Sequence, residues 1–186
     1  TNILLEKLAD KIEKLYGTTV NPKTEITVTA GATQAIFTTI TTFIKSGDEV
    51  ILIEPAYDSY GPSIEICGGI VVPYEMKAPE FKIDWGELEK LINSKTRMLI
   101  FNTPHNPTGS ILSENDLKTI EKIAEENDLI VLSDEVYEHL IFDNEKHQSV
   151  LRFPKLFQRS LAVYSFGKTF HATGWKIGYC VAPEHL

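Results

Sequence analysis

The chain has 186 residues and carries 18 lysine and arginine side chains against 26 aspartate and glutamate side chains, so its formal net charge is −8. Its 42% hydrophobic and 24% charged residues are typical of globular proteins and exclude collagen, extended disorder and a disulfide-dense miniprotein. The acidic balance argues against nucleic acid and anionic membrane surfaces as partners, because both attract basic proteins. No apolar run approaches the roughly 18 residues that a membrane span needs.

Two cysteines, Cys67 and Cys180, lie far apart in apolar segments and form no CxxC pair. We expect them to be buried free thiols, which fits a reducing compartment. No metal site is expected, because no histidine lies at ligand spacing from either cysteine. The chain begins at Thr1 directly with a charged amphipathic segment, so we expect no signal peptide and a cytoplasmic location.

Hydrophobic periodicity predicts helices and strands in alternation along the chain. Helices are expected at 2–15, 33–44, 84–93 and 114–127. Gly17 marks the end of the first helix, and the side chain of Ser113 caps the start of the last one. Short β-rich runs occur at 26–29, 49–53, 70–74, 98–101, 129–132, 161–164 and 177–181.

Several of these runs, at 50–53, 98–101 and 129–132, are apolar throughout, which is typical of strands covered on both faces. Strands that alternate with helices then predict a three-layer α/β/α sandwich with a mainly parallel sheet of about seven strands. No repeat or linker divides the chain, so one domain is expected.

Ligand sites of open α/β sheets lie outside the carboxyl ends of the strands. Five predicted strand ends carry glycine, polar or aromatic residues, in segments that begin at Ala30, Glu54, Asn102, Ser133 and Ser165. Because these ends converge on one edge of a parallel sheet, we expect the functional site there.

The segment Gly31-Ala32-Thr33 opens a predicted helix with small residues, so its backbone N–H groups and the positive end of the helix dipole could face an anion. A tight strand-to-helix turn explains these residues equally well. The segment is neither GxGxxG nor a Walker loop, which argues against dinucleotide and triphosphate binding.

Asp134 ends an apolar strand, where a carboxylate is costly unless a cation or several donors meet it. A cap for a following helix is the structural alternative. Tyr137 could turn its hydroxyl toward the same edge. Pro104 and Pro107 stiffen the loop that carries Asn106, although ordinary turn chemistry accounts for this loop as well.

Lys168 follows another strand end and has Phe166, Phe170 and Trp175 as sequence neighbours. These aromatic residues favour partial desolvation, and so the neutral amine that attacks a carbonyl group. A solvated surface lysine is the ordinary alternative. Two further histidines, His105 and His171, are expected to support the site or to lie at the surface.

Four segments carry a family resemblance when they are taken in order: NPTG at 106–109, SDEVY at 133–137, SFGKTF at 165–170 and GWKIG at 174–178. Together they resemble the large domain of the class I/II aminotransferases, fold type I enzymes that use pyridoxal 5′-phosphate. The chain is most similar to the branch with kynurenine aminotransferases, cysteine-conjugate β-lyases and methionine-preferring aminotransferases. The resemblance extends over nearly the whole chain.

The resemblance implies a role for each residue around the cofactor ring. Lys168 is the Schiff-base lysine and later moves the substrate proton. Asp134 pairs with the pyridine nitrogen, and Tyr57 stacks on the ring. Tyr137 and Asn106 hydrogen-bond the phenolic oxygen, and Asn106 also helps to seat the substrate carboxylate.

At the other end of the cofactor, the resemblance implies that four residues hold the phosphate: the amides of Ala32 and Thr33, the Ser165 hydroxyl and the Lys176 ammonium. Two positions differ from many relatives. Gly167 stands where many have serine, which leaves Ser165 as the phosphate hydroxyl. Lys176 stands where many have arginine and offers a point charge in place of a bidentate fork.

The resemblance implies that residues 1–186 are a pyridoxal-phosphate-binding large domain without the N-terminal arm and the small C-terminal domain, and that this chain alone does not turn over. The parent would form a homodimer and transfer the amino group of an L-amino acid of methionine, aromatic or kynurenine type to a 2-oxo acid. Alternatives are β-elimination from cysteine conjugates, an inactive cofactor-binding fragment, and a Rossmann-like nucleotide binder in which Lys168 has no role.

Overall fold

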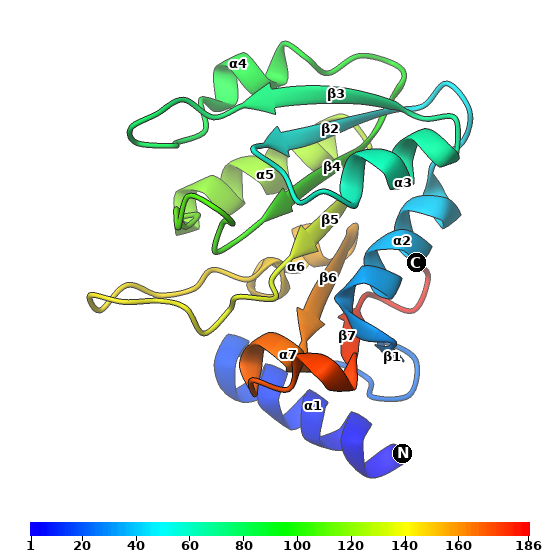
Figure 1. The fold of residues 1–186 in the computed structure, drawn as a ribbon, viewed down its shortest axis with the longest axis vertical. Helices are drawn as coiled ribbons and strands as arrows, with labels where there is room; N and C mark the ends of the chain where they lie inside the picture. The colour runs from blue at the N-terminus through cyan, green and yellow to red at the C-terminus, as the bar shows by residue number, and fades with distance from the viewer.

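A computed structural model describes all residues 1–186 and contains one seven-stranded sheet (Figure 1). The strand order across the sheet is β1-β7-β6-β5-β4-β2-β3. The strands are β1 (Ile26–Thr29), β2 (Glu49–Glu54), β3 (Ile70–Glu75), β4 (Thr96–Asn102), β5 (Ile130–Asp134), β6 (Ser160–Ser165) and β7 (Gly178–Val181).

The sheet is mainly parallel, as the sequence predicts. Strands β3, β2, β4, β5 and β6 pair in parallel, whereas β7 is antiparallel to both β6 and β1. Six strands therefore end at one edge, and β7 begins there. The register places Asn102 of β4 opposite Asp134 of β5, and Asp134 opposite Val163 of β6.

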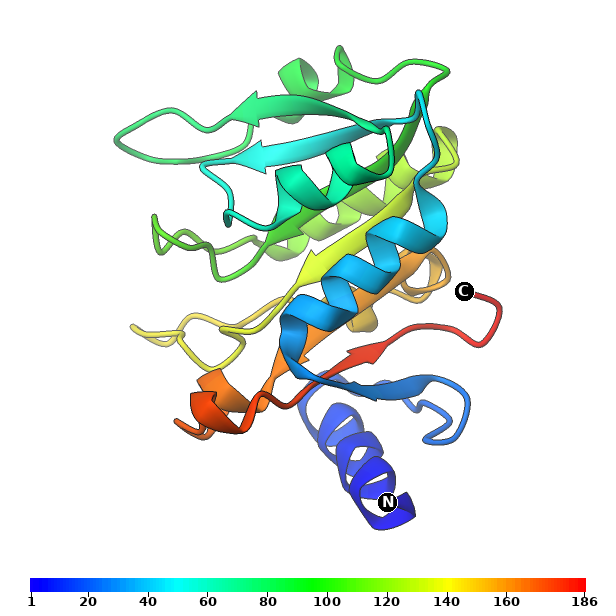
Figure 2. The same cartoon turned by 45° about the vertical axis from the view of Figure 1, so that its right-hand side comes forward.

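Helices cover both faces of the sheet, which gives three layers (Figure 2). One face packs against α1 (Asn2–Tyr16), α4 (Trp85–Glu89), α5 (Glu114–Glu126) and α6 (Pro154–Phe157). The other face packs against α2 (Gly31–Phe43) and α3 (Tyr60–Ile66). The short helix α7 (Phe166–Thr169) and the 3₁₀ turn η2 (Thr173–Trp175) lie between β6 and β7, and the turn η1 (Val150–Arg152) precedes α6.

Successive strand residues alternate between two buried cores. On β5, Val131 belongs to the core under α1 and α5, whereas Leu132 belongs to the core under α2 and α3. Both side chains are 0% exposed. This arrangement explains the continuous apolar runs, because each strand residue faces one of two covered sides.

Helices α1, α2 and α5 match the predicted ranges to within two residues, α4 is shorter than predicted, and α3, α6 and α7 were not among the predicted helices. Gly17 ends α1 in the left-handed conformation, with φ 73°. Ser113 and Asp116 form a reciprocal capping box that starts α5. The helix predicted at 84–93 is wrong beyond Glu89: its continuation forms tight turns in which Leu91 N donates to Leu88 O at 3.0 Å.

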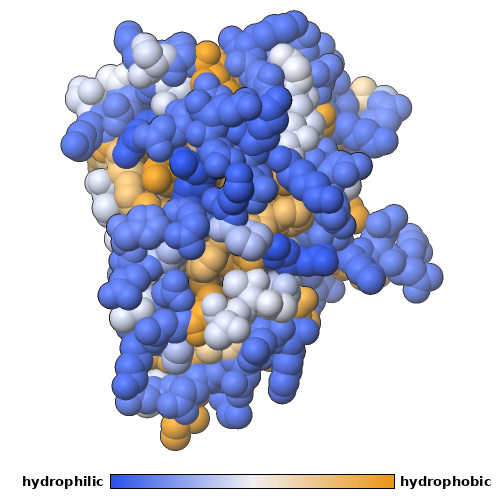
Figure 3. All heavy atoms as spheres, turned by 180° about the vertical axis from the view of Figure 1, so that it is seen from behind, coloured by the Kyte–Doolittle hydropathy of each residue, from blue (hydrophilic) through white to orange (hydrophobic).

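Both cysteines are free thiols, as the sequence predicts, but only Cys180 is buried, and Cys67 is half-buried. Burial raises the pKa of the Cys180 thiol to about 12. None of the helices combines the length and the apolar character that crossing a membrane requires. The back of the molecule is largely hydrophilic, with hydrophobic side chains visible in separate patches (Figure 3).

Candidate active site

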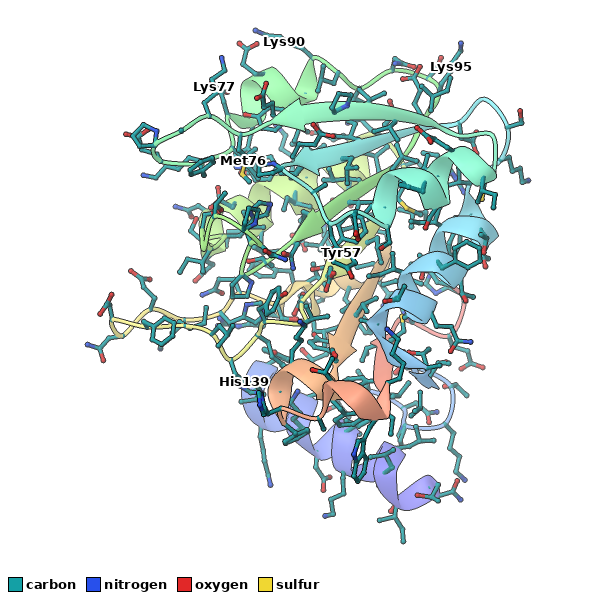
Figure 4. The ribbon with its side chains drawn as sticks, in the orientation of Figure 1. Tyr57, Met76, Lys77, Lys90, Lys95 and His139 are labelled. Atoms are coloured by element: carbon teal, nitrogen blue, oxygen red, sulfur yellow. The ribbon has the colours of Figure 1, made fainter.

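A cavity of about 160 Å³ lies at the edge of the sheet where the parallel strands end. Its walls come from the start of α2, the segments after β2 and β4, the end of β5, the end of β6 and the residues before β7. Every site residue predicted from the sequence lines it: Ala32, Thr33, Tyr57, Asn106, Asp134, Tyr137, Ser165, Lys168 and Lys176. Tyr57 lies near the middle of this edge in Figure 4.

Asp134 is the buried acid of the cavity, with 5% of its surface exposed. Its Oδ2 accepts a hydrogen bond from the Tyr60 hydroxyl, and its Oδ1 accepts one from Val136 N at 3.2 Å. Burial raises the pKa of Asp134 to about 6, while these two hydrogen bonds act in the opposite direction. The sequence predicts that a cation or several donors meet this carboxylate, and the hydrogen-bonding partners in the structure are two neutral donors. The alternative role as a helix cap is wrong, because no helix follows Asp134 directly.

Tyr60 is a site residue that the sequence analysis missed. It is the first residue of α3, is 2% exposed and lies edge-on to Tyr57, with ring centroids 5.9 Å apart. Burial, followed by the charge of Asp134, raises the pKa of Tyr60 well above its ordinary value, so the phenol stays a donor. Its spacing from Tyr57 was the only sequence signal, and that spacing does not reveal the contact with Asp134.

Asn106 is held in the cavity by a second residue that was not predicted. Asn106 N donates to Asn102 Oδ1 at 2.7 Å, and Asn102 Nδ2 donates to Asp134 O at 2.8 Å. Asn106 Nδ2 lies 3.4 Å from the Tyr137 hydroxyl. The two side chains expected at the cofactor's phenolic oxygen are therefore neighbours.

Lys168 faces the same cavity, with its Nζ 5.5 Å from the centroid of the Tyr137 ring. The expected desolvation by aromatic neighbours is wrong in this chain. Phe170 and Trp175 are 64% and 78% exposed, and Lys168 itself is exposed. Aromatic rings that are themselves in water do not exclude water from a nearby amine.

The part of the cavity beside helix α2 is suited to an anion. Helix α2 begins at Gly31 without a side-chain cap and without an acidic residue in its first turn. The first amides of a helix lack an intrahelical acceptor, and the helix dipole is positive there. A methyl group at Gly31 would lie 3.5 Å from Lys176 Cδ, which places that side chain beside the helix start.

Neither Lys168 nor Lys176 forms an ion pair within 4.0 Å. The cavity therefore holds two lysine side chains beyond ion-pair distance of any carboxylate, next to an uncapped helix start, and the charge of Lys168 acts on Asp134 from that distance. The start of β7 packs closely against this helix start, since a Cβ at Gly178 would lie 2.6 Å from Ala32 N. These features fit a phosphate group at this end and a carbonyl group near Lys168.

The two histidines lie outside the cavity, as expected. His105 is 7% exposed, and its Nδ1 lies 2.8 Å from Thr108 Oγ1 within the loop after β4. Burial lowers the pKa of His105, which keeps it neutral. His171 is exposed at the surface beside α7.

An amine, a buried carboxylate and an uncapped helix start surround one cavity at the strand ends of a mainly parallel sheet, an arrangement that fits a phosphate-bearing aldehyde. The family model described as aminotransferase class I and II matches residues 2–186. The chain belongs to this family, whose members depend on pyridoxal 5′-phosphate.

Similar proteins include several aminotransferases. The chain is 47% identical to methionine aminotransferase of Escherichia coli (strain K12) over 98% of its own length and 47% of that protein. It is 39% identical to kynurenine–oxoglutarate transaminase 3 of Homo sapiens, covering 98% of this chain and 42% of that protein. The chain thus spans about half the length of the relatives it matches.

Solved structures agree with the fold. An Escherichia coli protein identified as a methionine aminotransferase superimposes with a TM-score of 0.97 at 46% identity, covering 100% of this chain and 48% of that chain. Aspartate aminotransferase from Thermus thermophilus with maleate gives a TM-score of 0.92 at 34% identity, covering 99% of this chain and 47% of that chain.

Proposed function

We propose that this chain supplies the pyridoxal-phosphate-binding part of an aminotransferase that transfers the amino group of an L-amino acid to a 2-oxo acid. The amino donor is of methionine, aromatic or kynurenine type, and its methionine and kynurenine aminotransferase relatives support this choice. The observation that carries the proposal is that Lys168, Asp134 and the uncapped start of α2 surround one cavity.

When bound, the cofactor supplies an electron sink that stabilises negative charge at the substrate Cα. Lys168 would have two tasks in the cavity: its Nζ would hold the cofactor covalently and, as a free amine, would take the proton from the substrate Cα. The structure supports both tasks, because the amine is exposed to the cavity and has no ion-pair partner.

Asp134 holds a proton on the ring nitrogen. With its pKa at about 6, the carboxyl is mostly ionised at neutral pH and can accept a hydrogen bond from a protonated pyridine. Tyr60 and Val136 each engage one oxygen of this carboxylate, so its orientation is set before a ligand arrives. The remaining lone pairs on both oxygens stay free for the ring.

The other cavity residues orient the cofactor. Asn106 and Tyr137 bind its phenolic oxygen, and Tyr57 covers the ring face with an uncharged aromatic plane. The phosphate is held by four groups that combine hydrogen bonds, the helix dipole and direct charge: the Ala32 and Thr33 amides, the Ser165 hydroxyl and the Lys176 ammonium.

The wider setting belongs to the same proposal. Residues 1–186 would form the large domain of the parent enzyme, acting as a homodimer in the cytoplasm on small amino acids and 2-oxo acids. The acidic net charge supports the choice of small-molecule partners over nucleic acid.

The test is to add pyridoxal phosphate to the chain, fix any adduct with borohydride and locate it by mass spectrometry. We expect one adduct at Lys168 in the wild-type chain and none there in Lys168→Ala. The matched control is Lys118→Ala, which removes an exposed lysine on α5 whose partner is Glu114. Absence of an adduct at Lys168 in the wild-type chain would refute the proposal.

A further inference from the structure

The turn after β5 has two faces with different partners. Asp134 and Tyr137 line the cavity, whereas Glu135 and Glu138 are buried, at 0% and 5% exposure. We propose that Glu135 is a positioning residue that holds Asp134 at the cavity, and that His147 holds Glu135 in place. This inference rests on the proposed function and adds two residues that do not line the cavity.

Both oxygens of the Glu135 carboxylate are fully occupied. Oε1 accepts from Ser133 Oγ at 2.9 Å and from Val150 N at 3.0 Å. Oε2 accepts from the Tyr164 hydroxyl at 2.9 Å and from His147 Nε2 at 2.9 Å. Any rotation of this side chain would leave buried donors without partners, so the carboxylate is held rigidly.

The charge on Glu135 persists although the side chain is buried. Burial by itself raises the pKa of this carboxyl, but the hydrogen bond and charge of His147, with further hydrogen bonds, hold the pKa below its ordinary value. Glu135 is therefore an acceptor only, which makes His147 Nε2 the donor. A buried charge is costly unless it is paired and hydrogen-bonded, and this one is both.

His147 has no other polar partner. Its side chain is 6% exposed, its Nδ1 is buried without a hydrogen bond, and the ring lies edge-on to Tyr16 with centroids 6.0 Å apart. Burying an imidazole with one orphaned nitrogen costs free energy. The hydrogen bond from His147 Nε2 to Glu135 offsets this cost.

The backbone transmits the position of Glu135 to Asp134. Asp134 contacts Tyr60 of the core under α2 and α3, whereas Glu135 contacts Tyr164 of the core under α1 and α5. The two side chains therefore point to opposite sides of the sheet from one peptide link. Glu135 N donates to Val163 O at 2.9 Å on β6, and Thr103 N donates to Asp134 O at 3.0 Å on the other side. Because Asp134 and Glu135 share this peptide link, a backbone rotation at Glu135 would break these hydrogen bonds and turn Asp134 away from the cavity.

Glu138 provides an internal comparison. It is also buried, at 5% exposure, and it is held by Lys11 and Tyr16 of helix α1, with the exposed His139 beside that helix in Figure 4. It is four residues from Asp134 and shares no peptide link with it. A buried charge whose role is only structural should behave like Glu138.

The experiment compares two probes, pyridoxal phosphate and its 1-deaza analogue, in which CH replaces the ring nitrogen. Only the first probe can use a correctly placed Asp134. In the isosteric variant Glu135→Gln, we expect the preference for pyridoxal phosphate over the analogue to fall about tenfold. In Glu138→Gln, the urea midpoint should fall while the preference stays within about twofold of wild type.

Variants of His147 test whether this residue holds Glu135 in place. They also replace Glu135→Gln in the experiment if that variant does not fold. His147→Leu removes the donor and should lower the preference, whereas His147→Gln keeps an N–H donor and should restore most of it. An unchanged preference in both Glu135→Gln and His147→Leu overturns the inference, as does an equal loss in Glu138→Gln. A wild-type chain that forms no adduct at Lys168 would instead refute the proposed function.

Discussion

Removal of the Tyr60 hydroxyl should change the charge of Asp134 without changing the shape of the site. In Tyr60→Phe the ring that packs beneath the cavity is kept, and only the donor to Asp134 Oδ2 is lost. Burial already raises the pKa of Asp134 to about 6, and the Tyr60 hydrogen bond acts in the opposite direction. The substitution should therefore raise this pKa further.

The size of the effect follows from the strength of a hydrogen bond to a charged acceptor. Such a bond contributes about 1.5–3 kcal/mol, which corresponds to about one to two pH units. At pH 7 a carboxyl with a pKa of about 6 is about nine-tenths ionised. In the variant the ionised fraction should fall to between about one half and one tenth.

The assay has two parts. Carbon-detected NMR titration of the Asp134 carboxyl follows the pKa directly in the chain without cofactor. Titration with pyridoxal phosphate at several pH values follows the consequence: binding should weaken below about pH 6 in wild type and below about pH 7–8 in Tyr60→Phe. The matched control is Tyr74→Phe, whose hydroxyl accepts from Asp84 N at 2.7 Å and belongs to no part of the cavity.

An Asp134 pKa that stays the same or falls in Tyr60→Phe would refute this reasoning. It would mean that Val136 N and solvent replace the lost donor. A shift of similar size in Tyr74→Phe would show that the effect is not specific to the contact with Asp134.

Two further predictions concern stability. The pKa of Asp134 lies above its ordinary value in the folded chain, so the contribution of this carboxyl to stability is present at about pH 4 and is lost as the pH rises through about 6. In urea denaturation, Asp134→Asn should therefore raise the free energy of unfolding by up to about 3 kcal/mol at pH 7 and show no gain at pH 4. The same substitution should abolish selective binding of pyridoxal phosphate. An equal gain at both pH values would contradict this. Lys11→Met leaves the buried Glu138 charge without its cation and should cost about 3–5 kcal/mol, whereas Lys7→Met removes an exposed partner of Asp10 and should cost less than about 1 kcal/mol. Similar urea midpoints for the two lysine variants would show that the buried pair contributes nothing.

Much of the fold followed from local patterns. The apolar runs around Val131 and Leu99 predicted strands covered on both faces, because residues that alternate between two buried cores must all be apolar. Gly17 and Ser113 marked a helix end and a helix start through backbone conformation and capping, which depend on only a few neighbouring residues.

The antiparallel direction of β7 and the early end of α4 could not be predicted in the same way. A strand's direction depends on which neighbours it pairs with, and β7 lies between β1 and β6, far from β1 in sequence. Helix α4 ends at Glu89, and tight turns lead from it toward β4. These outcomes depend on tertiary packing, which local propensity does not describe.

For the site, the strand-end rule predicted which edge of the sheet to search, and the family resemblance chose Lys168, Asp134, Asn106 and Tyr57, which do line one cavity at that edge. The sequence by itself thus determined which side chains surround the cavity. Only the tertiary structure decided their surroundings: Tyr60 as the donor to Asp134, water around Lys168, and the link from Glu135 to His147. Burial and hydrogen bonding depend on distances between segments far apart in the chain, and no spacing along a sequence encodes these distances directly.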